Sequence, residues 1–483
     1  VELAVKPAGI RYRYAIALGP DGRALRMTTD VWTLASTDTA PAQHAIADFT
    51  GDSAHLSVVA RGGTQTLVLP ASPGAVPYIN LSTALLEQAV MRAKAMGGRL
   101  DSVPMFALAG GRNFVAPVEW IGADSATITL PGVVIRMAVA PDGSVLGAFA
   151  PSQNLRAERE GGAHPMGVAP VDYGAPPGAP YVAEDVTVRT PEGLTLTGTL
   201  TLPRLRSGRV PAIVTITGSG AEDRDERISI VNGYRPFWQV ADTLARRGIA
   251  TLRLDDRGIN GSDAGPASAT SADFANDIRA GLAYLRSRPE IDGTHLGLVG
   301  HSEGGMIAPM IAATDPSLRG IVLMAGTAQT GRQIMAYQAR NAIEHDTALS
   351  AAQRDSALAA AARSTDSLAQ HNAWVRYFLD YDPLATARKV RVPVLILQGE
   401  KDQQVTPEQA GALASAFRAG GNHDVTVRLF PNTDHLFVAD SDGFPGRYPS
   451  LPSGNVRPAV LGTLADWLVA HLGAGAKGHV TPE

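Results

Sequence analysis

The 483-residue sequence contains no cysteine. This excludes disulfide bonds, thiolate nucleophiles and cysteine-ligated metals, and it says little about the cellular compartment. Long apolar runs are missing as well, since no stretch approaches the roughly 20 residues that a membrane-spanning helix needs. Charge of one sign is not in excess either, because 42 basic and 46 acidic side chains give a formal net charge of −4. This balance favours neither nucleic acid nor an anionic membrane surface as a partner.

The remaining composition is that of a globular chain. Hydrophobic residues make up 45% and charged residues 18% of the sequence, which are ordinary values for packed domains. The length exceeds what one hydrophobic core usually covers, so two domains are expected. The sequence opens at Val1 in strand-like material, and either removal of a signal peptide or trimming of the chain explains this start. We therefore expect a periplasmic or secreted protein, with a cytoplasmic one as the alternative.

Residues 1–150 contain short segments in which apolar and polar residues alternate, separated by glycine, proline and aspartate. This pattern predicts a mostly antiparallel β domain built on one curved sheet, with a single helix over residues 82–96. The histidines His44, His55 and His164 are scattered and have no metal-ligand spacing, so no metal site is predicted. The expected strands are residues 12–18, 25–32, 55–61, 64–69, 115–121, 126–130 and 133–139.

The pattern changes after a breaker-rich stretch. Residues 151–183 are rich in proline and glycine and are predicted to form a linker. Over residues 184–483 a leading hairpin is followed by alternating short apolar strands and helices, which predicts an α/β domain with a mostly parallel sheet covered by helices on both faces. The expected strands are residues 186–189, 194–202, 212–217, 249–254, 296–299, 320–324, 394–397 and 425–430. The expected helices are residues 236–247, 272–287, 304–313, 407–418 and 460–472.

One long insertion separates two of the expected sheet strands. Residues 327–389 are polar, alanine-rich and helical in pattern, and an insertion at this point lies over the carboxyl edge of a parallel sheet. We predict a helical cap over an active site. Its aromatic residues Trp374, Tyr377, Phe378 and Tyr381 either line an acyl pocket or dock the cap onto the body of the domain, and both interpretations remain open.

The clearest chemical motif is Gly300-His301-Ser302-Glu303-Gly304. An apolar strand precedes it and an apolar helical pattern follows it, which is the context of a nucleophile elbow. A serine on such a tight, strained turn needs neighbours two residues before and after it that have little or no side chain. The motif therefore predicts that Ser302 is a nucleophile.

A serine hydroxyl needs a base to accept its proton and a carboxylate to orient that base. Asp402 and His435 each follow an expected strand, and the order Ser302, Asp402, His435 is the one expected for this architecture. Glu400 and Asp434 are the alternatives for the carboxylate. For the base, His423 precedes its strand and belongs at the opposite edge of the sheet, whereas His301 leaves the sharp turn in another direction.

An oxyanion formed on the substrate needs hydrogen-bond donors. One expected donor is the backbone N–H of Glu303, directly after the nucleophile. The second is expected from the glycine-containing loop after residues 212–217, from the N–H of either Ser219 or Gly220. A further loop around Asp256 and Arg257 is predicted to be a structural turn held by these two side chains.

These motifs together resemble the α/β-hydrolases. The resemblance covers about 300 residues from residue 184 onward and rests on Gly300-His-Ser-Glu-Gly304, Gly399-Glu-Lys-Asp402 and Asp434-His435. More narrowly, Thr217-Gly-Ser-Gly-Ala-Glu-Asp-Arg-Asp-Glu226 and Asp256-Arg-Gly258 are similar to a bacterial carboxylesterase subgroup between the dienelactone-hydrolase-like and prolyl-oligopeptidase-like hydrolases. The resemblance implies carboxylic ester hydrolysis through an acyl-enzyme, without a metal or organic cofactor.

Residues 1–150 lie outside this resemblance. Prolyl-oligopeptidase relatives have a β-propeller before the catalytic domain, but about 150 residues are too few to build one, and no blade-like repeat is visible. The N-terminal domain is therefore expected to be a substrate-side lid, an interaction module or a dimerisation element.

The sequence favours a serine carboxylesterase acting on short- to medium-chain esters. The alternatives are an aminopeptidase or amidase, an acyl-CoA thioesterase or acyltransferase with the same three residues, and a hydrolase fold that only binds. We expect a small-molecule ester as the partner, with a possible homodimer formed through the N-terminal domain or the cap.

Overall fold

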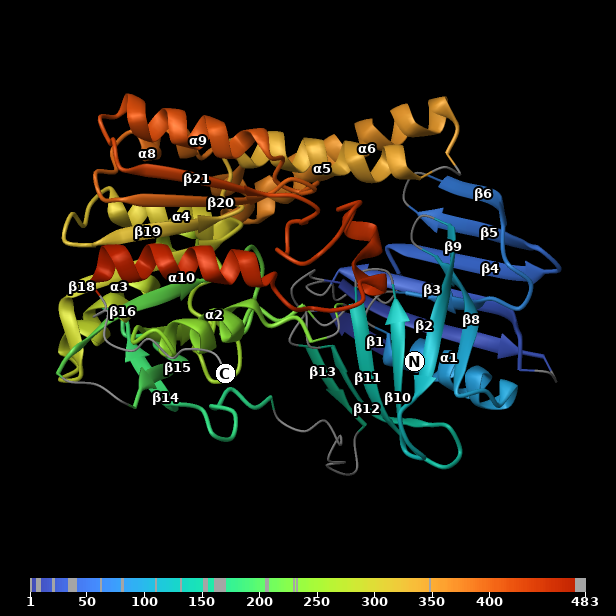
Figure 1. Cartoon of the computed structure of the whole chain (residues 1–483). Helices are drawn as coiled ribbons and strands as arrows, with labels where there is room; N and C mark the ends of the chain where they lie inside the picture. Colours follow the sequence, from blue (N-terminus) through green and yellow to red (C-terminus); the bar gives the residue numbers. More distant parts are fainter. Residues whose placement is uncertain are drawn as a thin grey trace. The chain divides into compact units, whose positions relative to one another are not determined.

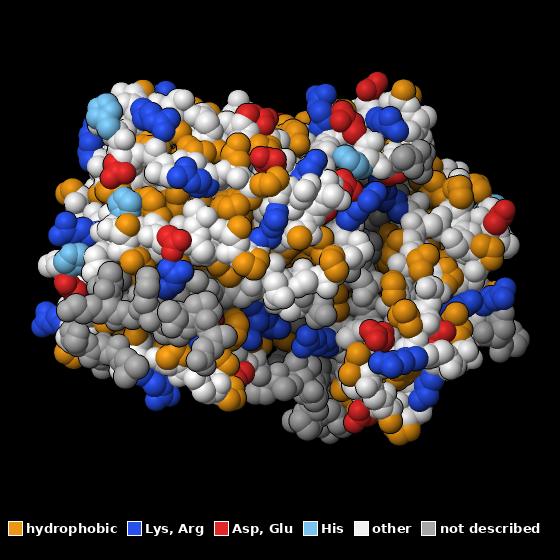
Figure 2. Space-filling model, viewed as in Figure 1, with side chains coloured by type: hydrophobic (Ala, Val, Ile, Leu, Met, Phe, Trp, Pro, Cys, Tyr) orange, Lys and Arg blue, Asp and Glu red, His pale blue; other side chains and the backbone are white. Residues whose placement is uncertain are grey.

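The computed structural model of the chain describes residues 2–5, 10–19, 22–33, 41–60, 63–79, 82–108, 111–130, 133–150, 155–159, 171–204, 208–228, 231, 233–346 and 349–473. The chain divides into two compact units, residues 1–170 and 171–483. In its described part no helix is both long and apolar enough to cross a membrane. On the face that Figure 2 shows, basic and acidic side chains are interspersed, as the small net charge leads one to expect.

The described residues of the first unit form two sheets and one helix, where the sequence predicted one curved sheet. In the first sheet the six strands follow chain order and each pairs with the next in antiparallel fashion. They are β1 (Glu2–Val5), β2 (Ile10–Leu18), β3 (Ala24–Thr33), β4 (Gln43–Thr50), β5 (Ser53–Ala60) and β6 (Gly63–Pro70). The second sheet has the order β13-β12-β11-β10-β9-β8-β7. Its strands are β7 (Val76–Tyr78), β8 (Leu100–Ala107), β9 (Arg112–Trp120), β10 (Ser125–Leu130), β11 (Val133–Val139), β12 (Val145–Ala150) and β13 (Leu155–Glu158).

Helix α1 (Thr83–Met96) packs on the second sheet of this unit. The Ser82 side chain caps its first turn by accepting from Leu85 N, and Gly97 ends it with a φ of 80°, a left-handed conformation that favours glycine. Val90 and its neighbours on the buried face of α1 join Met105 and Ile128 of the sheet in one apolar cluster. The helix predicted over residues 82–96 is thus present.

Residues 151–183, predicted to be a linker, are divided between the two units at residue 170. β13 begins at Leu155 and pairs with β12, and the second unit already starts at Val171. Tyr173 packs under the guanidinium of Arg224, 4.4 Å from its ring centre, which attaches the proline-rich segment to the second unit. The pieces of the linker at residues 151–154 and 160–170, with His164, lie outside the described residues.

The second unit is organised on an eight-stranded sheet with the order β14-β15-β17-β16-β18-β19-β20-β21. Strand β15 runs antiparallel to both of its neighbours, and the pairs from β17 to β21 are parallel. The strands are β14 (Tyr181–Arg189), β15 (Thr195–Pro203), β16 (Val210–Ile216), β17 (Ala250–Leu254), β18 (Ile291–His301), β19 (Gly320–Met324), β20 (Val394–Gly399) and β21 (Val425–Phe430). The predicted mostly parallel sheet with an antiparallel hairpin at its edge is confirmed.

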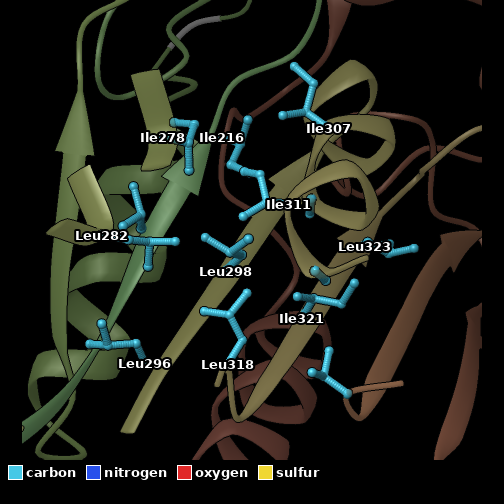
Figure 3. Packing of buried hydrophobic residues seen from close by; sticks show 14 of the residues in the cluster. Ile216, Ile278, Leu282, Leu296, Leu298, Ile307, Ile311, Leu318, Ile321 and Leu323 are labelled. Carbon is cyan, nitrogen blue, oxygen red and sulfur yellow. The ribbon is translucent and has the colours of Figure 1, made fainter. Parts of the chain in front are cut away.

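Helices cover both faces of this sheet, as Figure 1 shows. Side chains of α2 and α10 pack on one face with Val299 and Val322, and side chains of α3, α4, α8 and α9 pack on the other face with Leu298 and Ile321. Neighbouring strand residues point to opposite faces, so the uninterrupted apolar strands supply both layers. Figure 3 shows side chains of α3, α4, β16, β18 and β19 packed together on the face of the sheet that carries Leu298 and Ile321. These helices are α2 (Pro236–Ala245), α3 (Ser271–Ser287), α4 (Glu303–Ala312), α8 (Pro383–Ala387), α9 (Glu408–Ala419) and α10 (Pro458–Leu472).

The described part of the insertion between β19 and β20 is mostly helical. It contains α5 (Gly331–His345), α6 (Ala351–His371), α7 (Ala373–Asp380) and the short α8. Outside the insertion, a 3₁₀ helix, Pro445–Ser450, precedes α10. Figure 1 shows α5 and α6 side by side. Gln338 and Asn341 of α5 donate to the backbone carbonyls of Gln404 and Gln403 at 3.3 and 3.4 Å. The insertion therefore contacts the loop that follows β20, at the carboxyl edge of the sheet.

Candidate active site

Ser302 occupies the sharp turn between β18 and α4. Its φ of 53° is positive, a conformation that is uncommon outside glycine and that costs of order 1–3 kcal/mol. Its backbone N–H donates to the carbonyl of Met324 at 2.8 Å, which continues the β18–β19 ladder by one residue. The side chain of Ser302 is part-exposed while both of its neighbours in the chain are buried.

The glycines of the motif are required by close backbone contacts. A Cβ atom on Gly300 would lie 2.1 Å from the carbonyl oxygen of Gly304, and one on Gly304 would lie 2.1 Å from that of Ile216. Either contact is shorter than side chains tolerate, so any residue larger than glycine would displace the turn. The predicted need for small residues two positions before and after Ser302 is met.

Asp402 and His435 lie together, although 33 residues separate them in the chain. Nδ1 of His435 is 2.8 Å from Oδ2 of Asp402. The other carboxylate oxygen, Oδ1, accepts from the backbone N–H groups of Gln404 and Val405, each at 2.8 Å, and Gln398 donates to Oδ2 at 2.8 Å. The Asp402 side chain is 0% exposed. A buried carboxylate with this many donors is fixed in place and orients the imidazole.

The alternatives for these two positions lie elsewhere. Glu400 and His423 are exposed, and His423 precedes β21, at the opposite end of that strand from His435. Asp434 is buried and its carboxylate accepts from the N–H of Val438 at 3.1 Å within its own loop. Burial raises the pKa of Asp434 to about 7. Asp434 thus shapes the loop that carries His435.

His301 bonds on both sides of its ring and does not compete for the position of the base. Its Nδ1 lies 2.5 Å from Oε1 of Glu226, and its Nε2 lies 2.9 Å from the backbone carbonyl of His435. The 75 residues between His301 and Glu226 give the sequence no spacing signal for this contact. In the sequence, Glu226 is only the last residue of a motif and has no predicted role.

The loop after β16 is held from several directions. Gly218 N–H donates to Oε1 of Glu226 at 3.1 Å, so this amide is already bonded. Asp256 accepts from the Thr217 hydroxyl at 2.8 Å and from Glu222 N–H at 2.9 Å, and so fastens both ends of the loop. Gly220 has a φ of 128°, which favours glycine.

Asp256 and Arg257 therefore do more than hold their own turn, which was the prediction. Asp256 fixes the loop over residues 217–222, and Arg257 bonds Asp277 of α3 through Nε at 2.6 Å and Nη2 at 2.8 Å. Burial raises the pKa of Asp256 to about 8, which favours its neutral form at neutral pH.

A mostly apolar cavity of about 330 Å³ adjoins this loop. A Cβ atom on Gly218, at the cavity wall, would lie 3.5 Å from Cβ of Ser302, so one wall residue neighbours Ser302, although neither Ser302 nor His435 is among the residues that line the cavity. Its walls come from strands β15, β16 and β17, from α3 and α4, and from the insertion. The apolar lining residues are Leu196, Ile216, Ala221, Leu254, Ala264, Pro266, Ala269, Phe274, Ile278, Ile307 and Trp374. Phe274 and Ile307, missed by sequence reasoning, lie on helices that the sequence did predict.

The four aromatic residues of the insertion do not all face the cavity. Trp374 lines the cavity, stacks on the buried Phe378 at 5.4 Å and donates through Nε1 to Oε1 of Glu303 at 2.8 Å. Tyr377 and Tyr381 stack on each other at 5.7 Å and line a separate, open hollow. Of the four residues proposed for an acyl pocket, Trp374 alone lines this cavity.

The order of the strands, the single antiparallel strand β15 and the strained serine between β18 and α4 define an α/β-hydrolase fold. A family model described as "Serine aminopeptidase, S33" matches residues 231–442. The chain belongs to the α/β-hydrolase superfamily and is a hydrolase.

Comparison with curated protein sequences and with solved structures gives distant relatives. Esterase EstD of Thermotoga maritima is 25% identical over 295 residues, which cover 60% of this chain and 68% of that protein. The uncharacterized peptidase YuxL of Bacillus subtilis is 26% identical over 270 residues, 53% of this chain and 35% of that protein. Among solved structures, the Pyrococcus furiosus esterase Pf2001 superposes with a TM-score of 0.42 and 14% identity, covering 60% of this chain and 92% of that one.

Proposed function

We propose that this protein is a serine carboxylesterase that hydrolyses short- to medium-chain carboxylic esters through an acyl-enzyme on Ser302. The observation that carries the proposal is the hydrogen bond between His435 Nδ1 and the buried carboxylate of Asp402, on loops at the carboxyl edge of the sheet that also carries Ser302. The 25% identity to an esterase over 60% of the chain supports the ester as the bond that is cleaved.

In this reaction His435 is the general base. The bond from Nδ1–H to Asp402 leaves the lone pair of Nε2 for the proton of the Ser302 hydroxyl. The serine oxygen then attacks the ester carbonyl, and the protonated His435 returns the proton to the departing alcohol. In the second half-reaction, water attacks the acyl carbon and gives a proton to His435. The bond to Ser302 then breaks, His435 returns the proton to the serine oxygen, and the carboxylic acid leaves.

The negative oxygen that forms on the substrate is stabilised by backbone donors in this proposal. The N–H of Glu303 is one of the first amides of α4, and such amides have no acceptor within their helix. The second donor is the N–H of Ser219 or Gly220, in the loop that Asp256 and Glu226 hold. The N–H of Gly218 donates to Glu226 and is therefore not that donor.

The acyl group fits the cavity beside Ser302 in this proposal, and the helical insertion serves as its cap. Ligand pockets commonly measure ~300–1,000 Å³, so a cavity of about 330 Å³ is small. Its apolar walls suit an aliphatic chain, and its size supports short to medium lengths. Two contacts of the insertion, Trp374 with Glu303 and Gln338 with the loop of Asp402, support its role as a cap.

A second candidate is an aminopeptidase or amidase with the same three residues. The match to a family model described as a serine aminopeptidase favours it. An amide differs in its leaving group, since the amine must be protonated by His435 before it departs. The two candidates are therefore separated by their substrates and share Ser302, Asp402 and His435.

Hydrolysis of p-nitrophenyl esters from acetate to dodecanoate, together with aminoacyl p-nitroanilides, tests the proposal. We expect turnover of the shorter esters, little turnover of the anilides, and loss of activity in Ser302→Ala. Activity that persists in Ser302→Ala would exclude this serine as the nucleophile. Faster turnover of the anilides than of any ester would transfer the assignment to the aminopeptidase.

A further inference from the structure

Behind the imidazole of His435 lies a buried pair of side chains to which the proposed reaction gives no role. His301 and Glu226 are joined through Nδ1 and Oε1 at 2.5 Å, and their side chains are 4% and 2% exposed. The ring of His301 lies 4.8 Å from the ring of His435, tilted by 42°, and Phe437 packs against its other side at 6.0 Å. The pair is therefore placed to act on the base.

Hydrogen-bond geometry shows how many protons the pair holds. The backbone carbonyl of His435 only accepts hydrogen bonds, so Nε2 of His301 carries a proton. The contact between Nδ1 and the carboxylate oxygen requires a second proton between them. Burial is the largest single influence and opposes a charge on the ring, but Glu226, the backbone carbonyl of His435 and Asp402 together raise the pKa of His301 above its usual value. This direction favours the second proton on the ring, so His301 is taken as an imidazolium in the proposal below.

The charged groups around this imidazolium come from three loops. Glu226 faces it from the loop before α2, Asp402 from the loop after β20, and His435 from the loop after β21. Glu222 and Asp256 lie farther back beside Glu226, and burial raises the pKa of each, that of Asp256 to about 8. Asp256 is favoured as a neutral acid at neutral pH, and Glu226 is the carboxylate that bonds the ring of His301.

Glu226 also connects the pair to the loop after β16. Its Oε1 accepts from Gly218 N–H at 3.1 Å in addition to His301. Its backbone has a φ of 56°, a strained conformation for a residue with a long side chain, and such strain gathers at functional positions. Oε2 of Glu226 is buried and has no hydrogen-bond partner among the described residues. One carboxylate thus bonds both the residue before Ser302 and the loop of Ser219 and Gly220.

We propose that His301 and Glu226 are a positioning pair that keeps the base His435 in its neutral form and aligns its loop with the loop that donates to the oxyanion. The inference rests on the proposed esterase function, in which neutral His435 must accept a proton from Ser302. Asp402 stabilises the protonated form of His435, and the positive ring of His301 opposes this.

The first experiment is the pH profile of kcat/KM for p-nitrophenyl butyrate. In Glu226→Gln an amide N–H₂ in the place of Oε1 donates to Nδ1 of His301, so the ring becomes neutral, and the bond from Gly218 N–H to the same atom is lost. We expect the acid limb of the profile to move up by about one pH unit. His301→Gln removes the same charge and should move the limb in the same direction. Phe437→Leu alters the packing against His301 without changing charge, and it should leave the limb in place.

A purely structural role would lower activity without moving the acid limb. An acid limb in Glu226→Gln and His301→Gln that coincides with that of the unaltered protein would therefore overturn the proposal, however much the rate falls. Circular dichroism on each variant identifies any that does not fold, and either variant alone is sufficient for this comparison.

Nitrogen NMR of histidine-labelled protein tests the charge without a substrate. His301→Gln and His435→Gln identify the two rings by loss of their signals. At pH 7 we expect both nitrogens of His301 to be protonated, and the titration midpoint of the His435 ring to rise in Glu226→Gln. A His301 ring with one protonated nitrogen would overturn the proposal. If the unaltered protein hydrolyses no ester, the esterase function fails, whereas this measurement still decides whether the pair carries the charge.

Discussion

At the scale of single residues, Asp402 shows how much one carboxylate can determine. Three donors of its own neighbourhood and the imidazole of His435 meet on its two oxygens. Two neighbouring backbone amides hold Oδ1, and the side chains of Gln398 and His435 bond Oδ2, so the carboxylate has a single orientation. The tautomer of His435 follows from that orientation, because Nδ1 must carry the proton.

Asp402→Asn should abolish most activity and leave the fold intact. The amide oxygen of the substituted side chain retains the bonds from Gln404 and Val405, but its N–H₂ group faces Nδ1 of His435 and forces the proton onto Nε2. The base then has no lone pair for Ser302, and kcat should fall by about 10⁴-fold. Glu400→Gln is the matched control, since Glu400 is exposed beside the same loop, and it should keep full activity. Equal losses in both variants would contradict the assignment of Asp402.

Asp256 makes stability depend on pH. Burial raises its pKa to about 8 in the folded protein, while an unfolded aspartate titrates near ~4. Between these values the folded state retains a proton that the unfolded state has released. Stability therefore falls as pH rises through this window, by up to about 1.4 kcal/mol per pH unit from this one group.

Asp256→Asn removes this dependence, because the amide does not titrate. Urea unfolding at pH 5, 6, 7 and 8 should show the variant gaining stability relative to the unaltered protein as pH rises. Asp380→Asn replaces an exposed carboxylate and should follow the unaltered protein at every pH. A constant difference between Asp256→Asn and the unaltered protein would show that Asp256 does not remain protonated in the fold.

At the scale of elements, α7 connects the insertion to the turn that carries Ser302. Nε1 of Trp374 donates to Glu303 and its ring forms part of the cavity wall, while Tyr377, one turn further on, faces the open hollow. Residues three and four apart on a helix share a face only approximately. One helix therefore presents neighbouring aromatic rings to two different places.

Trp374→Ala should change which acyl chains are accepted. Removing the indole enlarges the cavity beside Ser302, so the ratio of kcat/KM for the decanoate ester to that for the butyrate ester should rise by about tenfold. Tyr377→Ala is the matched control and should leave the ratio unchanged. An unaltered ratio in Trp374→Ala would show that the acyl chain lies outside this cavity.

The elements themselves were predictable to different degrees. In the second unit every predicted strand and helix is present, because uninterrupted apolar runs and helical periodicity are strong local signals. In the first unit the sequence missed β4, β8 and β12, together with the short β1, β7 and β13. Strand β8 contains Pro104, and β4 has a single buried position, so neither has the clean alternation of a strand with one apolar face. The division into two sheets depends on which strands pair, and alternation does not show this.

At the scale of the whole chain, the boundary between the units lies before the predicted start of the α/β domain. Tyr173 donates to Asp223 at 3.0 Å and its carbonyl accepts from Arg253 at 3.1 Å, while buried Tyr181 donates to Asp242 at 2.7 Å. The second unit has its own apolar layers on both faces of its sheet. A domain with its own core is expected to fold alone.

A chain of residues 171–483 should therefore fold and unfold cooperatively, and a chain of residues 184–483 should be less stable. The shorter chain loses the buried ring of Tyr181 and the contacts of Tyr173, which should cost roughly 3–5 kcal/mol. Urea unfolding of both chains measures the difference, and Tyr181→Ala in the longer chain separates the contribution of this ring. If the two chains unfold at the same urea concentration, the second unit begins at residue 184 and residues 171–183 do not stabilise it.

The sequence by itself determined the α/β-hydrolase fold, the turn of Ser302 and the chain order of Ser302, Asp402 and His435. These features depend on local physics: the periodicity of apolar residues, and the steric demand that allows only glycine beside the turn. Strands of a parallel sheet end at one edge, so residues that follow them are expected near one another without further information.

Tertiary structure alone decided the contacts between distant loops. The pair of His301 and Glu226, the hold of Asp256 on the loop after β16, and the cavity walls from α3, α4 and α7 join segments that no spacing relates. Such contacts depend on how helices and loops pack over the sheet edge. Small shifts in that packing change which side chains meet, because a hydrogen bond requires its atoms to lie within a few tenths of an ångström of the ideal separation.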